Sequence, residues 1–372
     1  MSILEIIGRD QELFTSDIEF FSKEISERVK RSKFLVIGGA GSIGQAVTKE
    51  IFKRDPQALH VVDISENNMV ELVRDLRSTE GYGSGDFRTF AVDCGSVEFE
   101  ALMASEGPYD YVFNLSALKH VRSESDPYTL MRMIMVNVFN TIKTLRLANK
   151  MGAKKYFCVS TDKAANPVNM MGASKRIGEM IIRAAATEAK ISISAVRFGN
   201  VLDSAGSVLP LFEEQIAMGG PVTVTHSDVE RYFMTAEEAS RLVLQATALN
   251  ENQTNKDAPI YILEMGNPVK ISHLARQLIR LRGLVPDRDI EIKYTGLRPG
   301  EKITETLMNH DESLESTYIN GIKRLTEEMY TPVDMRDSVR QLIKALNEHD
   351  EVKVKSALFT LLPEFTPNGS LS

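Results

Sequence analysis

A glycine-rich turn constrains the fold of this chain more than any other part of its sequence. Residues 38–44 have the sequence GGAGSIG, directly follow the apolar run Phe34–Ile37, and precede a segment with helical patterning. Glycines permit a tight turn from a strand into a helix, and they let the backbone approach a pyrophosphate at the helix N-terminus. The sequence therefore predicts a strand, a dinucleotide-binding turn and a helix in this order.

Short β-branched runs alternate with longer helical patterns after this turn, as is typical of a parallel sheet with helices on both faces. The predicted strands are Phe34–Ile37, Leu59–Val62, Phe87–Val92, Tyr111–Leu115, Tyr156–Ser160 and Ile193–Arg197. We therefore expect an α/β protein, with a Rossmann-type doubly wound parallel sheet and a smaller C-terminal substrate-binding lobe.

The alternation changes near Phe198, where polar and glycine-rich segments interrupt it. Apolar residues at helical spacing before the first strand predict a docked N-terminal helix. The expected division is an N-terminal helical extension over 1–30, an NAD-binding domain over 31–198 completed by parts of 232–266, and a substrate-binding lobe with C-terminal helices over 199–231 and 267–372.

Composition excludes several classes of protein. The net charge of −7 argues against a nucleic-acid partner, and two cysteines are too few for a disulfide framework or a multi-thiolate metal site. We expect no metal. No run approaches the ~20 apolar residues of a membrane-spanning helix, and the N-terminus lacks the features of a signal peptide. The sequence therefore predicts a cytoplasmic protein without an integral membrane segment.

Asp63 indicates which dinucleotide is bound. It lies nineteen residues after Gly44, at the end of the second predicted strand. A carboxylate there accepts hydrogen bonds from an adenosine ribose and repels a 2′-phosphate, so we predict NAD. NADP is the alternative, and it would need a basic residue elsewhere. In a Rossmann-type sheet the ends of the second, third and fourth strands lie beside the cofactor. We therefore predict further cofactor contacts at Ser65, Asp93, Cys94, Leu115, Ser116 and Ala117.

Two neighbouring motifs indicate acid–base chemistry. Residues 159–163 have the sequence VSTDK, and residues 171–175 have the sequence MGASK. Asp162 and Lys163 supply a candidate acid and a candidate base side by side. Because neighbours in a strand point to opposite faces, both could serve one substrate only if the strand has already ended.

These motifs resemble those of the extended short-chain dehydrogenases/reductases, specifically the UDP-N-acetylglucosamine 4,6-dehydratases of bacterial polysaccharide and glycoprotein biosynthesis. The similarity spans nearly the whole chain. The family also has membrane-anchored members, and this chain resembles their catalytic portion. It rests on residues 38–44, 117–121, 160–164, 166–175, 197–201 and 295–302.

The resemblance implies that NAD takes a hydride from C4, that water is eliminated across C5 and C6, and that the hydride returns to C6. Lys163 is then the candidate base for the C5 proton, Asp162 the acid for the C6 hydroxyl, and Thr161 the ligand of the C4 oxygen. Lys175 is expected to bind the nicotinamide ribose. Further implied cofactor contacts are Ala40, Gly41, Ser42, Ile43, Lys119, Asn137, Ser160, Phe198, Asn200 and Val201.

Met171 stands where a catalytic tyrosine is expected. Met171 and Lys175 share one helical face, but a methionine cannot exchange a proton. Three interpretations compete: a dehydratase branch that tolerates methionine, an inactive cofactor-binding relative, or a misaligned motif. We favour the first, in which either Asp162 or a water and ribose relay to Lys175 deprotonates the C4 hydroxyl.

The resemblance also implies a site for UDP-N-acetylglucosamine. Two arginines suit its diphosphate, and a glutamate suits its ribose. The predicted substrate contacts are Lys119, His120, Thr161, Asn200, Ser207, Val208, Leu209, Thr223, Thr225, Arg231, Arg298 and Glu301. By analogy with the family we expect a homo-oligomer. A nucleotide-sugar 4-epimerase and a noncatalytic NAD- or sugar-nucleotide-binding protein are the competing functions.

Overall fold

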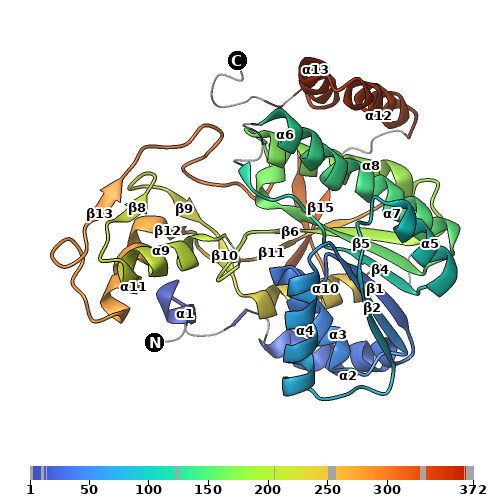
Figure 1. The fold of residues 1–372 in the computed structure, drawn as a ribbon, viewed down its shortest axis with the longest axis horizontal. Coiled ribbons are helices and arrows are strands. Elements are labelled where there is room, and N and C mark those ends of the chain that lie inside the picture. The colour runs from blue at the N-terminus through green and yellow to red at the C-terminus, as the bar shows by residue number, and fades with distance from the viewer. Residues whose placement is uncertain are drawn as a thin grey trace.

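A nine-stranded sheet forms the centre of the computed structural model (Figure 1). The structure describes residues 3–9, 12–13, 15–121, 124, 126–204, 206–249, 257–326, 332–363 and 365. The strand order is β14-β15-β11-β6-β5-β4-β1-β2-β3, and neighbours are parallel from β3 to β11. The bounds are β1 Lys33–Ile37, β2 Ala58–Asp63, β3 Asp86–Ala91, β4 Tyr111–Asn114, β5 Lys155–Thr161, β6 Ser192–Phe198, β11 Ile260–Leu263, β14 Ser313–Ser316 and β15 Ile322–Thr326.

All six predicted strands are present, each within one residue of its expected ends. Their order, with β1 at the centre and β4 on the side opposite β2, is that of a doubly wound Rossmann sheet. The predicted fold class is therefore confirmed.

Helices cover both faces of this sheet, and two apolar clusters hold them there. One face carries α2 Thr15–Lys30, α3 Ser42–Phe52, α4 Glu66–Thr79 and α10 Ala236–Ala248. The other face carries α5 Val97–Glu106, α7 Asn140–Lys150 and α8 Met170–Ala186. This cover buries both sheet faces and leaves the carboxyl ends of the parallel strands as the place for a site.

The sheet continues further along the chain than the sequence suggested. Strands β14 and β15 form a hairpin, and β15 pairs antiparallel with β11 through the buried Ile322 and Leu325. The sequence predicted that the smaller lobe resumes at residue 267 and therefore includes residues 313–326. These residues belong to the central sheet instead, where β15 covers the edge that β11 would otherwise expose.

A C-terminal helical hairpin covers α8. Helices α12 Pro332–Asn347 and α13 Glu351–Leu361 pack against α8 and α6 Pro127–Ile134 in a third apolar cluster (Figure 1). Helix α8 is consequently buried along nearly its whole length. Pairing of two copies through cofactor-domain helices stays a prediction, and it would have to use surface that this hairpin leaves free.

The smaller lobe contains α9 Val208–Ala217, α11 Ile271–Leu281 and three short strand pairs. The pairs are β8 Val222–Val224 with β13 Ile292–Tyr294, β9 Glu230–Arg231 with β12 Val269–Lys270, and β7 Asn200–Val201 with β10 Phe233–Met234. Helix α1 Ile3–Ile6 packs in this lobe, whereas α2 packs on α10. The N-terminal segment therefore contacts both parts of the molecule. Within the described residues, no helix combines the length and the apolar character needed to cross a membrane.

Candidate active site

The glycine-rich turn has the geometry expected of a dinucleotide-binding turn. Gly38 has a φ of +73° and donates its N–H to the Val62 carbonyl at 2.7 Å. The Asp63 carboxylate accepts the N–H of Ala40 at 3.0 Å and that of Ser65 at 2.9 Å. Asp63 thus joins the turn to the end of β2, and Ser65 caps α4. The N-terminus of α3 faces the cavity with Ser42 at its first position.

Gly44→Ala and Gly41→Ala should separate the two requirements of this turn. A Cβ at Gly44 would lie 2.0 Å from the Gly38 carbonyl oxygen, whereas a Cβ at Gly41 would meet that oxygen at 3.5 Å. We expect Gly44→Ala to destabilise the fold by about 1–3 kcal/mol through overpacking. Gly41→Ala should keep the fold and weaken dinucleotide binding, because Gly41 lines the cavity and a methyl group there adds bulk to the turn. Urea unfolding and NAD titration measure both effects. Equal stability losses in the two variants would contradict this assignment.

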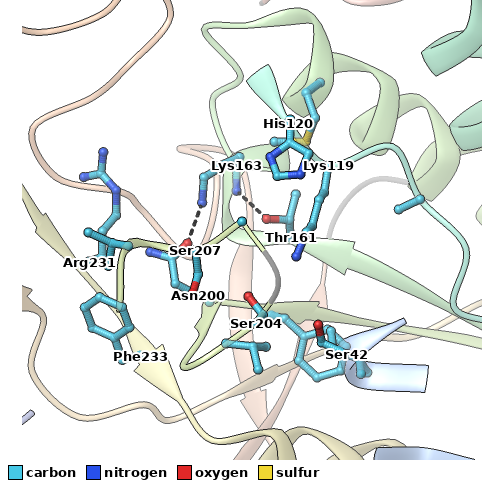
Figure 2. A pocket seen from close by; sticks show the side chains of 18 of the residues that line it. Ser42, Lys119, His120, Thr161, Lys163, Asn200, Ser204, Ser207, Arg231 and Phe233 are labelled. Atoms are coloured by element: carbon cyan, nitrogen blue, oxygen red, sulfur yellow. Dashed lines mark hydrogen bonds between the residues drawn. The ribbon is translucent and has the colours of Figure 1, made fainter. Parts of the chain in front are cut away.

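A cavity of about 500 Å³ opens beyond the turn, between the carboxyl ends of the central strands and the smaller lobe. Figure 2 shows Lys119, Thr161, Lys163 and Asn200 directed into it. The predicted residues that line it are Gly38, Gly41, Ser42, Ile43, Gly44, Leu115, Ala117, Lys119, His120, Ser160, Thr161, Lys163, Met171, Lys175, Phe198, Asn200, Val201, Ser207, Val208, Thr223, Thr225, Arg231, Arg298 and Glu301.

Other predicted residues lie outside the lining of this cavity: Ala40, Asp63, Ser65, Asp93, Cys94, Ser116, Asn137, Asp162 and Leu209. The lining also contains residues that the sequence did not single out, among them Ser204, Leu211, Phe212, Phe233 and Ile271. Most of these additional residues are apolar and belong to the smaller lobe. The short strands and helices of that lobe carry no sequence motif that would have identified them.

The strand carrying the acid–base motif ends before the motif is complete. Strand β5 ends at Thr161, and Asp162–Ala164 form a 3₁₀ turn, η3. The condition for Asp162 and Lys163 to serve one substrate is therefore met in the backbone. Thr161 and Lys163 line the cavity, but Asp162 lies behind them with 0% of its surface exposed.

Asp162 reaches the cavity only through its neighbours. Its Oδ1 accepts hydrogen bonds from Thr161 Oγ1 at 2.9 Å and from Lys163 Nζ at 2.9 Å. Its Oδ2 is buried and has no hydrogen-bond partner among the described residues. Lys163 Nζ also donates to Asn200 Oδ1 at 3.3 Å (Figure 2). Asp162 is therefore connected to the cavity through its hydrogen bonds with Thr161 and Lys163, and its role as the acid stays a prediction.

Helix α8 places Met171 and Lys175 below the cavity. Asn169 caps the helix by accepting the Gly172 N–H at 2.8 Å. Met171 lines the cavity with 3% exposure, and Lys175 Nζ donates to the Val159 carbonyl at 3.1 Å. Burial lowers the pKa of Lys175 to about 8, although the nearby Cys158 and Glu179 oppose the shift. Lys175 is thus a buried amine that can gain or lose a proton near neutral pH.

Asn137 supports the neighbouring loop. It lies in the π-helical turn η2 Met135–Phe139 and is buried. Its side chain bonds both the N–H and the carbonyl of Leu118, each at 3.0 Å, and donates to Ser174 Oγ at 2.9 Å. These bonds fix the backbone just before Lys119. Burial lowers the pKa of Lys119, and burial together with Lys119 lowers that of His120.

The far end of the cavity holds the residues predicted for a diphosphate and a ribose. Arg231 donates to the carbonyls of Ile303 and Lys302, each at 2.9 Å, and so supports the 301–303 loop. Glu301 accepts hydrogen bonds from Thr225 at 3.1 Å and from Arg231 at 3.4 Å. Arg298 is exposed on the cavity rim. The Arg231 guanidinium is thus engaged in bonds within the protein, whereas Arg298 lies at the exposed rim of the cavity.

A buried ionic network lies beneath the motif. Glu179 accepts hydrogen bonds from Ser160 Oγ at 2.6 Å and from Arg197 at 2.6 and 2.8 Å. Glu312 bonds Arg197 and Arg176 from the opposite side. The charged Arg197 in an otherwise uncharged strand was the available sequence signal for this network. Among the described residues, no group of histidines, cysteines and carboxylates could hold a metal ion.

The fold and this site define a protein of the extended short-chain dehydrogenase/reductase type, with a glycine-rich turn and a cavity of about 500 Å³ at the carboxyl ends of its strands. Residues 34–327 match the family described as polysaccharide biosynthesis protein, and the chain belongs to that family.

Individual relatives agree with this assignment. The capsular polysaccharide biosynthesis protein CapD of Staphylococcus aureus is 38% identical over 95% of this chain, which spans 57% of CapD, a little over half its length. A UDP-N-acetylglucosamine 4,6-dehydratase (inverting) of Campylobacter jejuni is 29% identical over 75% of this chain and 78% of that protein. The X-ray structure of Pen from Bacillus thuringiensis is similar with a TM-score of 0.69 and 27% identity, covering 86% of this chain and 99% of that one.

Proposed function

We propose that this protein is a UDP-N-acetylglucosamine 4,6-dehydratase that uses NAD and serves the synthesis of a surface glycan or glycoprotein sugar. One observation carries the proposal. The Thr161–Asp162–Lys163 turn combines a hydroxyl and an amine at the cavity with a carboxylate buried behind them, whereas the position of a catalytic tyrosine holds Met171. An elimination needs such an acid–base pair, and a simple oxidation does not.

The residues present fit NAD. The glycine-rich turn and the N-terminus of α3 would hold the pyrophosphate, because Gly38, Gly41 and Gly44 line the cavity there without side chains of their own. Asp63 would face the adenosine ribose, and Lys175 would face the nicotinamide ribose. When bound, NAD supplies a hydride acceptor next to the sugar, so that the hydride removed from C4 can return to C6 and no external oxidant is needed.

The protein's own residues then move protons. Thr161 binds the C4 oxygen, and its hydroxyl already donates to Asp162, so the proton released from the C4 hydroxyl can pass to the buried carboxylate. Lys163 takes the proton from C5. The C6 hydroxyl leaves as water and takes the proton that Asp162 has received. This proton returns to the cavity through Lys163 or Thr161. After the hydride reaches C6, Lys163 returns a proton to C5, so that one water is lost in total.

The proton of the C4 hydroxyl has two candidate acceptors, Asp162 and a relay to Lys175. The Thr161–Asp162 hydrogen bond favours Asp162. Lys175 is engaged with the Val159 carbonyl, although its lowered pKa keeps the relay through a ribose hydroxyl as the second route. At the other end, Arg298 and Arg231 would bind the diphosphate, Glu301 the uridine ribose, and the segment with Thr223 and Thr225 the uracil.

The competing functions give different products. A 4-epimerase needs no elimination pair and normally uses the missing tyrosine. Purified protein incubated with UDP-N-acetylglucosamine, without added reductant, should yield a product lighter by one water. Unchanged mass with inverted C4 would support an epimerase, and no turnover with retained NAD binding would support a noncatalytic protein.

We predict retention of configuration at C5, giving the D-xylo keto sugar. Retention follows if Lys163 both removes and returns the C5 proton on one face of the ring. The Campylobacter relative is named as inverting, so this prediction rests on the methionine at position 171 in this chain. Proton NMR of the product formed in deuterated water reads the configuration at C5, and an L-arabino product would contradict the prediction.

A further inference from the structure

A buried carboxylate outside the predicted motifs faces the acid–base pair. Glu305 follows the 295–302 motif and is 5% exposed. Its Oε1 lies 4.0 Å from Lys163 Nζ and 4.0 Å from Arg231 Nε, and its Oε2 lies 3.8 Å from Lys302 Nζ. Oε2 has no hydrogen-bond partner among the described residues. Glu305 is therefore a buried carboxylate surrounded by three cations.

The loop that carries Glu305 is fastened to the catalytic turn. Lys302 Nζ donates to the Ala165 carbonyl at 2.9 Å, and Asn169 Nδ2 donates to the Gly300 carbonyl at 2.8 Å. The N–H of Asn166 donates to Asn309 Oδ1, and Asn309 is itself bonded to Glu312. These bonds hold the 300–309 loop against residues 162–169, so the position of Glu305 relative to Lys163 is built into the fold.

Lys163 consequently lies between two carboxylates. Its Nζ bonds Asp162 Oδ1 and Asn200 Oδ1, and Glu305 Oε1 is the next acceptor. An ammonium group has three N–H donors and a neutral amine only two, so three surrounding acceptors favour the ammonium form. A base must instead be neutral when it takes the C5 proton. Some group must therefore set when Lys163 gives up its own proton.

We propose that Glu305 is the positioning residue that controls the proton on Lys163. Its negative charge holds the amine at the cavity and stabilises its ammonium form. Arg231 and Lys302 surround Glu305 with positive charge, which leaves the less surrounded Asp162 as the carboxyl that accepts the proton from the C4 hydroxyl. In that step the C4 O–H bond breaks and an Asp162 O–H bond forms. Glu305 is then the remaining carboxylate beside Lys163 when the C5–H bond breaks and the Lys163 N–H bond forms. This role rests on the proposed dehydratase function.

Direct titration of Lys163 tests the proposal without requiring turnover. Protein with ¹³C- and ¹⁵N-labelled lysine is titrated by NMR, and the Lys163 signal is assigned with Lys163→Arg. In Glu305→Gln the loss of a neighbouring negative charge should lower the titration midpoint of Lys163 by about one to two pH units. The amide keeps the size of the side chain, so the difference reports charge.

Two further variants complete the test. Glu230→Gln is the matched control. Glu230 accepts a hydrogen bond from the Thr304 hydroxyl at 2.9 Å at the surface, so this substitution removes one negative charge beside the same loop. The Lys163 midpoint should then stay in place. Glu305→Asp keeps the charge and should stay near the wild-type midpoint. If Glu305→Gln does not fold, Glu305→Met removes the same charge with a side chain of similar length, and it should also lower the midpoint.

An unchanged Lys163 midpoint in folded Glu305→Gln, or in Glu305→Met if that variant is the one that folds, would overturn the proposal. A shift of equal size in Glu230→Gln would also overturn it. Turnover of UDP-N-acetylglucosamine by the wild type is measured separately, so that a failed dehydratase function remains distinguishable from a failed role for Glu305. In an active enzyme, the rising limb of the pH–rate profile should move with the midpoint.

Discussion

Lys163→Ala is expected to lower the rate of dehydration by about 10²- to 10⁴-fold, which is the usual contribution of a general acid or base. Lys163 is the amine at the cavity that bonds the buried Asp162, and its removal leaves the C5 proton without an acceptor. Asp162→Asn should cause a loss of similar size, because an amide cannot store the proton that the departing hydroxyl requires. Product formation is measured by chromatography and mass spectrometry.

The NAD affinity of both variants should remain close to that of the wild type, since neither side chain lies at the glycine-rich turn. Lys270→Ala is a matched control: it removes an exposed lysine that is also paired with an aspartate, Asp228. Its turnover should be unchanged. If Lys163→Ala and Asp162→Asn both retained full dehydration, their assigned roles in the elimination would be wrong.

Glu179→Ala should reduce the free energy of unfolding by about 3–5 kcal/mol. The substitution removes one of the two carboxylates, Glu179 and Glu312, that the described residues place beside the buried Arg197 and Arg176, and breaking a buried ionic network costs several kcal/mol. Urea denaturation followed by circular dichroism measures the loss. The matched control is Glu188→Ala, which removes an exposed glutamate paired with Arg336 and should change stability by less than about 0.5 kcal/mol. Equal effects in the two variants would contradict the structural role of the network.

The same network makes stability depend on pH. Burial raises the pKa of Glu179, but the attraction of Arg197 and then of Arg176 outweighs burial and lowers it to about 2. A lowered carboxyl pKa contributes stability that is present above the pKa of the unfolded chain, near 4.3. That contribution is lost as the pH falls from there towards 2. The wild type should therefore lose more stability than Glu179→Ala over this window.

Local signals in the sequence predicted the central sheet well. The β-branched runs and the GGAGSIG turn depend on neighbouring residues alone, and the six predicted strands appear within one residue of their limits. The hairpin of β14 and β15 was missed because the four residues Ser313–Ser316 are all exposed and carry no apolar pattern. These residues join the sheet only through β15, which itself pairs with β11, about sixty residues earlier in the sequence.

The candidate site was predictable where a motif carries the chemistry. Thr161, Lys163, Met171 and Lys175 meet at one cavity as expected. The burial of Asp162 was not predictable, because it depends on how the chain turns after β5. Glu305 was missed for a related reason: its proximity to Lys163 arises from the packing of two loops more than a hundred residues apart.

Transfer of hydrogen within the sugar tests the central proposal most directly. UDP-N-acetylglucosamine carrying deuterium at C4 is incubated with the purified protein, and the product is examined by mass spectrometry and NMR. We predict a product that has lost one water and carries the deuterium in the methyl group at C6, because the hydride taken from C4 returns there. Deuterium that remains at C4 in a product of unchanged mass would contradict the proposed dehydration.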